Sequence, residues 1–152
     1  MKKFIFISLI GFALLGCENK KGAFLETVKT NNDVPTAVEK FIKIVQDQGL
    51  TYFETIDHAK NAKDAGLRMQ AESVVIFGNP KMGTKLMQCN PSMGLDLPLR
   101  MLFSTDYEGK TTITYTNPEY WSLKHNIKDK KCLAIIRKAN IAMQNLAEAA
   151  SK

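Results

Sequence analysis

The sequence predicts an α+β fold in which helices pack on one face of a mainly antiparallel sheet. Two amphipathic patterns, over about 34–45 and 129–150, have the apolar spacing of helices. Several short alternating or β-branched runs lie between them and have the period of strands. The 152 residues, 45% hydrophobic and 24% charged, are enough for one domain with its own core and are not typical of a disordered chain.

The first predicted elements are a strand and a helix. Residues 24–28 are β-prone and predict the strand. Apolar residues then recur every third or fourth position over 34–45, which predicts a helix. Asp33 or Asn32 is expected to cap its N-terminus, and Gly49 to end it.

The middle of the chain continues with strands that alternate with short helices. The β-branched and aromatic stretch 50–56 predicts a second strand, and residues 58–65 predict a short helix that Gly66 ends. The continuous apolar run over 73–77 predicts a central strand buried on both faces. Residues 78–80 (Gly-Asn-Pro) break this run.

A hairpin and a long helix complete the predicted domain. Alternation over 99–105 and 110–116, on either side of the turn residues 108–109, predicts two paired strands. The final helix is predicted over 129–150, with an apolar stripe that packs on the sheet. The other expected elements are a short helix (81–88), an irregular stretch (90–98) and a short aromatic helix through Tyr120 and Trp121.

The N-terminus has the pattern of a secretory signal. Lys2 and Lys3 precede an apolar run over 4–16, which is too short to span a bilayer comfortably. The run ends in Leu-Leu-Gly-Cys at Cys17, which resembles the lipobox of bacterial lipoproteins. The resemblance implies cleavage before Cys17 and attachment of lipid to its thiol. The alternative is an ordinary signal peptide that happens to contain a cysteine.

These features predict a signal peptide (1–16), a polar tether (17–23) and a single domain (24–150) in the cell envelope. The domain is expected to face the periplasm, and Glu18 slightly favours the outer membrane. Loss of Lys2 and Lys3 with the signal lowers the formal net charge from +6 to +4, which is not the signature of a nucleic-acid-binding protein.

Five segments in the middle of the chain occur together and in this order in one known family: 55–59 (Thr-Ile-Asp-His-Ala), 66–67, 75–84, 97–100 and 115–118. On these segments the chain resembles the bacterial and archaeal domain-of-unknown-function family 302 (DUF302). The resemblance covers about residues 25–146 and implies the TATA-binding-protein-like fold, with helices on a curved antiparallel sheet. It implies no DNA binding and no assigned activity.

Four residues are candidates for a ligand site: Asp57, His58, Asn79 and Arg100. Asp57 is a ligand contact or, more simply, a helix cap, and His58 is an acid–base group or a metal ligand. Asn79 either contacts a ligand or stabilises its own turn. Arg100 binds an acidic ligand or pairs with Asp57 if it faces the concave side of the sheet, and otherwise only contacts water.

The histidine and cysteine positions leave further alternatives. His125 has no ligand-spaced partner and is predicted on the surface. Cys89 and Cys132 are expected either to pair as a disulfide or to be buried separately. Soft Cu(I) binding by His58, Cys89 and nearby methionines is a minor alternative. The methionines concerned are Met69, Met82, Met87, Met93 and Met101.

No catalytic, zinc or nucleotide motif is present in the sequence. We therefore expect a lipid-anchored, non-catalytic binding or accessory domain that takes a small molecule and needs no cofactor or metal. The alternatives are a His58-dependent enzyme or a periplasmic redox or metal-handling protein, and an interaction protein that forms a homodimer.

Overall fold

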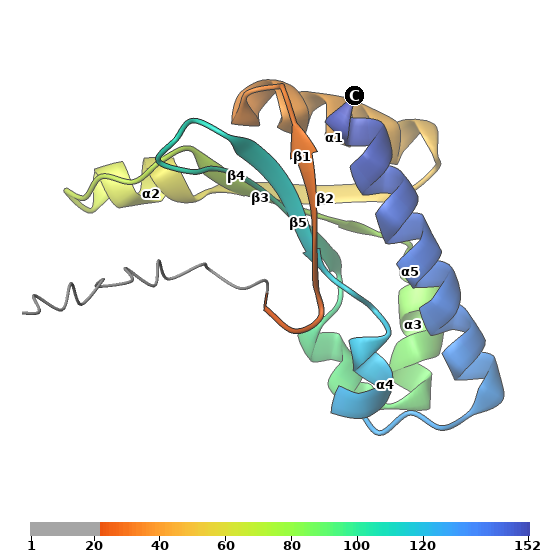
Figure 1. Cartoon of the computed structure of the whole chain (residues 1–152). Coiled ribbons are helices and arrows are strands. Elements are labelled where there is room, and N and C mark those ends of the chain that lie inside the picture. Colours follow the sequence, from red (N-terminus) through yellow and green to blue (C-terminus); the bar gives the residue numbers. More distant parts are fainter. Residues whose placement is uncertain (1–21) are drawn as a thin grey trace, which may run out of the picture.

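The computed structural model describes residues 22–152 (Figure 1). The predicted signal peptide, Cys17 and most of the predicted tether lie outside the described residues. The elements are, in chain order, β1 (Leu25–Thr30), α1 (Val34–Asp47), β2 (Thr51–Asp57), α2 (His58–Asp64), β3 (Glu72–Gly78), α3 (Pro80–Cys89), the 3-10 helix η1 (Pro91–Leu95), β4 (Leu99–Thr105), β5 (Thr111–Thr116), α4 (Tyr120–Lys124) and α5 (Lys130–Ser151).

The five strands form one antiparallel sheet in the order β1-β5-β4-β3-β2. Helices α1 and α5 lie side by side on one face of this sheet, and α3 lies beside the lower part of α5 (Figure 1). The predicted α+β class, with helices on one face of an antiparallel sheet, is confirmed.

The main core fills the space between the sheet and the α1–α5 layer. The ring of Phe41, on α1, lies 4.9 Å from that of Phe77 and 5.3 Å from that of Phe103, on β3 and β4. All three side chains are fully buried. Asp33 caps α1 as expected, because its carboxylate accepts a hydrogen bond from the Thr36 amide at 2.9 Å.

The prediction that residues 73–77 are buried on both faces is wrong. Ser73, Val75 and Phe77 are buried against the helices, whereas Val74 and Ile76 point to the other face and are half-buried. A continuous apolar run is typical of a strand covered on both faces, but the helices of the described residues cover one side of this sheet. We call the uncovered side the open face.

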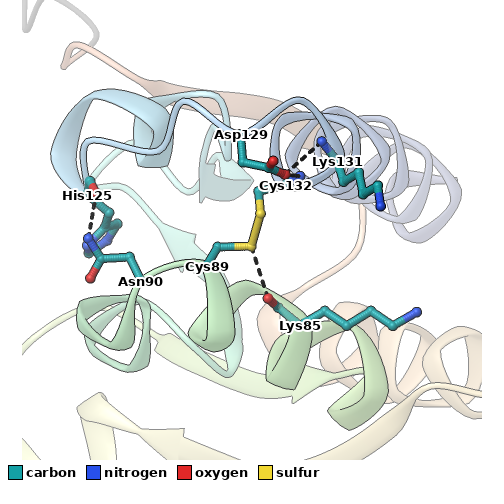
Figure 2. Close-up of a disulfide and its surroundings, with 7 residues drawn as sticks. All are labelled: Lys85, Cys89, Asn90, His125, Asp129, Lys131 and Cys132. Atoms are coloured by element: carbon teal, nitrogen blue, oxygen red, sulfur yellow. Dashed lines mark hydrogen bonds between the residues drawn. A yellow bond between two sulfur atoms is a disulfide. The ribbon is translucent and has the colours of Figure 1, made fainter.

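A second, smaller core joins α3, η1, α4 and the start of α5. Trp121 and Met93 lie at its centre and are almost completely buried. The disulfide between Cys89 and Cys132 crosses this core, with 6.4 Å between the two Cα atoms, and connects the end of α3 to the start of α5 (Figure 2).

Two irregularities in the sheet shape its surface. The register between β2 and β3 shifts between Tyr52 and Glu54, so that Phe53 forms a bulge on an edge strand. The pairing of β4 with β5 covers Leu102–Thr105 and Thr111–Thr114, so these strands separate toward the end of the domain where β4 begins. Residues on both sides of this separation line a pocket.

Candidate functional site

Asp57 and His58 stand at the junction of β2 and α2. The Asp57 carboxylate accepts a hydrogen bond from the Lys60 amide at 2.8 Å, which makes it the N-cap of α2. The cap therefore accounts for Asp57 without a ligand. His58 is half-buried, its side chain makes no hydrogen bond to a described residue, and it lines neither of the two pockets described below.

Asn79 caps α3 and also lines a pocket. Its side-chain oxygen accepts a hydrogen bond from the Met82 amide at 3.2 Å. The same side chain borders an apolar cavity, so its amide nitrogen is available to a ligand as a donor. Both interpretations of Asn79 drawn from the sequence are therefore compatible with its position.

Arg100 lies on the open face of β4. Its Nη2 donates to the Leu95 carbonyl at 3.0 Å, and its side chain lines the pocket between β4 and β5. The pairing of Arg100 with Asp57, one of the alternatives drawn from the sequence, is not formed, since Arg100 stands opposite Ile76 and Asp57 opposite Ser73. Asp57, His58, Asn79 and Arg100 therefore do not converge on one site.

The more apolar cavity, of about 580 Å³, lies between α3 and α5, and we call it the apolar pocket. Met82 and Met87 line it from α3, and Ile135 and Ala142 from α5. Phe53, on the β2 bulge, lies at its border and is 47% exposed. A cavity of this size and apolar character is typical of small-molecule sites, which measure about 300–1,000 Å³.

The other cavity, of about 520 Å³, lies where β4 and β5 separate, and we call it the split-sheet pocket. Arg100 and Thr116 line it from the two strands, and η1 and α4 close it with Asp96 and Lys124. Lys124 Nζ lies 2.9 Å from an Asp96 carboxylate oxygen. Of the two cations that line this pocket, Lys124 is therefore paired with a carboxylate, whereas Arg100 forms no ion pair with a described carboxylate.

His125 is buried, contrary to the expectation of a surface histidine. The residue is 3% exposed, with Nδ1 2.6 Å from Ser92 Oγ and Nε2 2.5 Å from an Asp96 carboxylate oxygen. Burial alone would raise the pKa of the Asp96 carboxyl, but hydrogen bonds from Lys124 and His125, together with their charges, hold the pKa below its usual value. The sequence carries no local sign of this cluster, because its members come from two distant loops.

Ser92, His125 and Asp96 are residue types found in hydrolase triads, but their arrangement here is architectural. In such triads Ser contacts Nε2 and Asp contacts Nδ1 of the histidine, and here the two are exchanged. Neither Ser92 nor His125 lines either pocket. Asn90 donates to the His125 carbonyl at 2.8 Å (Figure 2), so the cluster fastens η1 to the end of α4.

The minor alternative of Cu(I) binding loses three of its candidate ligands in this structure. Cys89 is bonded to Cys132 and has no free thiolate, and Met93 and Met101 are fully buried. Within residues 22–152, no group of three or more His, Cys, Asp and Glu side chains could hold a metal ion. None of the helices in the described part of the chain has the length and hydropathy needed to cross a membrane.

The fold defines a small α+β domain, with one antiparallel sheet, its helices on one face and a pocket between two of those helices. The chain belongs to the family described as "Domain of unknown function DUF302", whose model matches residues 26–150. A crystal structure of an uncharacterised conserved DUF302 protein from Bacillus stearothermophilus has a TM-score of 0.75 and 15% identity, over 85% of this chain and 99% of that one. At this identity, the likeness shows a shared fold.

Two curated relatives match part of the chain. Both are called "Fluoride-specific ion channel FluC 1", one from Brucella suis biovar 1 (strain 1330) and one from Brucella abortus biovar 1 (strain 9-941). Each is 36% identical over 103 residues, which is 68% of this chain but 41% and 38% of the two relatives. The chain thus spans about two-fifths of the length of these relatives.

Proposed function

We propose that this protein is an envelope lipoprotein whose DUF302 domain binds an apolar small molecule between α3 and α5. The apolar pocket is the observation that carries the proposal. In it, a mostly apolar wall is combined with a few polar groups, as in sites that hold a ligand in one orientation. The domain acts without a catalytic group of its own.

Two polar side chains are placed to orient such a ligand. Asn79 presents its side-chain amide at one end of α3, and Lys138 contributes an ammonium group from the exposed side of α5. An apolar body inside the pocket and an acceptor or anionic group at its border would satisfy both. The ligand class we propose is therefore an apolar molecule that carries one polar group.

The walls of the apolar pocket are held together covalently. The Cys89–Cys132 bond joins α3 to α5, the two helices that form most of the wall. A site held in place before binding loses less conformational freedom when the ligand enters. Phe53 and Met87 leave apolar surface exposed at the border, at 47% and 38%, which a ligand would cover.

The proposed location rests on the sequence. The lipobox-like segment that ends at Cys17 supports acylation, and two or three acyl chains would hold the domain firmly at a membrane. The residue after Cys17 is Glu18, which favours the outer membrane. The channel activity in the names of the Brucella relatives belongs to proteins of which this chain matches about two-fifths, and we do not extend it here.

Ligand binding is tested by titration with N-phenyl-1-naphthylamine, a neutral fluorophore that brightens in apolar sites. Ala142→Phe places a ring in the apolar pocket and should weaken probe binding by about tenfold or more. Ala149→Phe, an exposed position on the same helix outside the pocket, is the matched control and should bind as the wild type does. Equal probe affinity in the two variants would refute the site.

The anchor is tested by intact mass measurement of protein extracted from membranes. We expect a chain that begins at Cys17 and carries acyl chains, and a Cys17→Ser variant that leaves the membrane fraction. Residues 1–16 still attached, with no added lipid mass, would contradict the anchor while leaving the ligand assay to be judged separately.

A further inference from the structure

Four exposed apolar side chains gather at the end of the domain where the chain enters β1. Leu95 on η1 and Leu123 on α4 are both 72% exposed, and Phe24 and Leu25 are 42% and 37% exposed. Figure 1 shows the start of β1, the segment before β4 and α4 together at the bottom of the molecule. We call this region, formed by residues 22–25, η1 and α4, the tether end.

Direct contacts hold the parts of the tether end in place. The Phe24 and Tyr120 rings lie 4.9 Å apart, and the Asn117 amide donates to the Phe24 carbonyl at 2.7 Å. The Asp96–Lys124 ion pair joins η1 to α4. The apolar side chains are therefore presented by a fixed surface.

The tether end also carries positive charge. Arg100 and Lys124 line the split-sheet pocket, which opens among these apolar residues, and Lys128 follows α4 as an exposed cation. Asp96 balances Lys124, and Glu119 is an exposed carboxylate on the same end. Arg100 donates to the neutral Leu95 carbonyl, so its charge is available to an anion such as a lipid phosphate.

The length of the tether limits where this surface can lie. Cys17 precedes Gly22, the first described residue, by five positions. Five residues span at most roughly 17 Å when fully extended. An acylated Cys17 would hold Gly22, where the tether end begins, within that distance of the lipid headgroups.

We propose that the tether end lies against the bilayer, with its apolar side chains in the interfacial region and Arg100 facing the phosphate of an anionic lipid. This docking face rests on the proposed acylation of Cys17. Apolar side chains combined with basic residues bind anionic membrane surfaces through burial and electrostatic attraction together. The acyl anchor supplies retention, and the docking face fixes which side of the domain points away from the membrane.

The orientation is tested with the acylated full mature protein in vesicles of phosphatidylcholine and phosphatidylglycerol. Leu123→Cys and Tyr107→Cys each introduce one free thiol for a nitroxide label, because Cys89 and Cys132 are bonded and Cys17 is acylated. Tyr107 is 91% exposed, in the β4–β5 turn on the opposite side of the molecule in Figure 1. We expect the label at 123 to collide with a water-soluble nickel chelate about tenfold less often than the label at 107.

Each outcome of the labelling experiment has a distinct meaning. Equal nickel collision rates at 123 and 107, in protein whose mass shows acylated Cys17, would refute the docking face and leave the anchor intact. A mass without acyl chains would overturn the anchor and the docking face together.

The role of Arg100 is tested separately in the labelled protein. Arg100→Gln should raise nickel collisions at position 123 in vesicles that contain phosphatidylglycerol and have little effect in phosphatidylcholine alone. Arg137→Gln, which removes an exposed charge on α5, is the matched control and should change neither value. Identical behaviour of the two variants would refute the headgroup contact.

Discussion

Removing the Cys89–Cys132 disulfide should strongly destabilise the domain. The bond joins residues 43 positions apart. In the chain-entropy model, a bridge that closes a loop of this length contributes about 4 kcal/mol, because it restricts the unfolded chain. The double variant Cys89→Ala/Cys132→Ala should therefore lose about 3–4 kcal/mol of unfolding free energy, and its Tm should fall by roughly 10–15 °C.

Urea unfolding monitored by circular dichroism measures this effect and identifies its origin. The dependence of unfolding free energy on urea should be steeper in the variant, since an uncrosslinked unfolded chain exposes more surface. Reductant should lower the midpoint of the wild type toward that of the variant and leave the variant unchanged. A variant whose midpoint equals that of the oxidised wild type would refute the reasoning.

Three further predictions concern stability. Phe41→Ala should cost about 3–5 kcal/mol in urea unfolding, because the ring is fully buried against Phe77 and Phe103, whereas a cost below 1 kcal/mol would contradict this packing. Asp57→Ala should destabilise α2 by about 1 kcal/mol, because the helix loses its N-cap. Since α2 has no buried residue, the loss should be seen as faster amide hydrogen exchange confined to α2. Unchanged exchange in α2 would exclude a stabilising cap at Asp57. Because the pKa of Asp96 is lowered in the folded protein, its carboxylate stabilises the fold above the ordinary carboxyl pKa of 3.8, and this contribution disappears as the pH falls through the lowered value. Asp96→Asn should therefore lose less stability than the wild type between about pH 5 and 2. Parallel profiles of stability against pH in the two proteins would refute this role of Asp96.

Local signals in the sequence were enough for most of the elements and for the caps at Asp33 and Asp57, but η1 was expected as an irregular stretch and Asn79 as a turn residue or a ligand contact rather than a cap. Asp33, Asp57 and Asn79 each bond an amide three positions later, so the whole motif lies within one short stretch of sequence. Alternation along 99–105 likewise indicated that Arg100 and Met101 point to opposite faces, because side chains of a strand alternate, but which face Arg100 occupies came from the structure.

The sites depended on contacts that the sequence does not encode locally. His125 stands in a polar stretch that is typical of the surface, and its partners Ser92 and Asp96 lie 33 and 29 positions away. Both pockets are likewise assembled from segments far apart in the chain. The run over 73–77 misled because Val74 and Ile76 on its second face are only half-buried, and no helix of the described residues covers that face.

The bulge at Phe53 has a consequence for self-association. An edge strand exposes N–H and C=O groups with which another molecule can pair, and a bulge disrupts the regular spacing that such pairing needs. β2 is therefore a poor template for a second copy, and the sheet could be extended into a dimer only along β1. That edge continues from the segment that leads to Cys17, so copies anchored through Cys17 as proposed above would have to approach each other with their entry strands first.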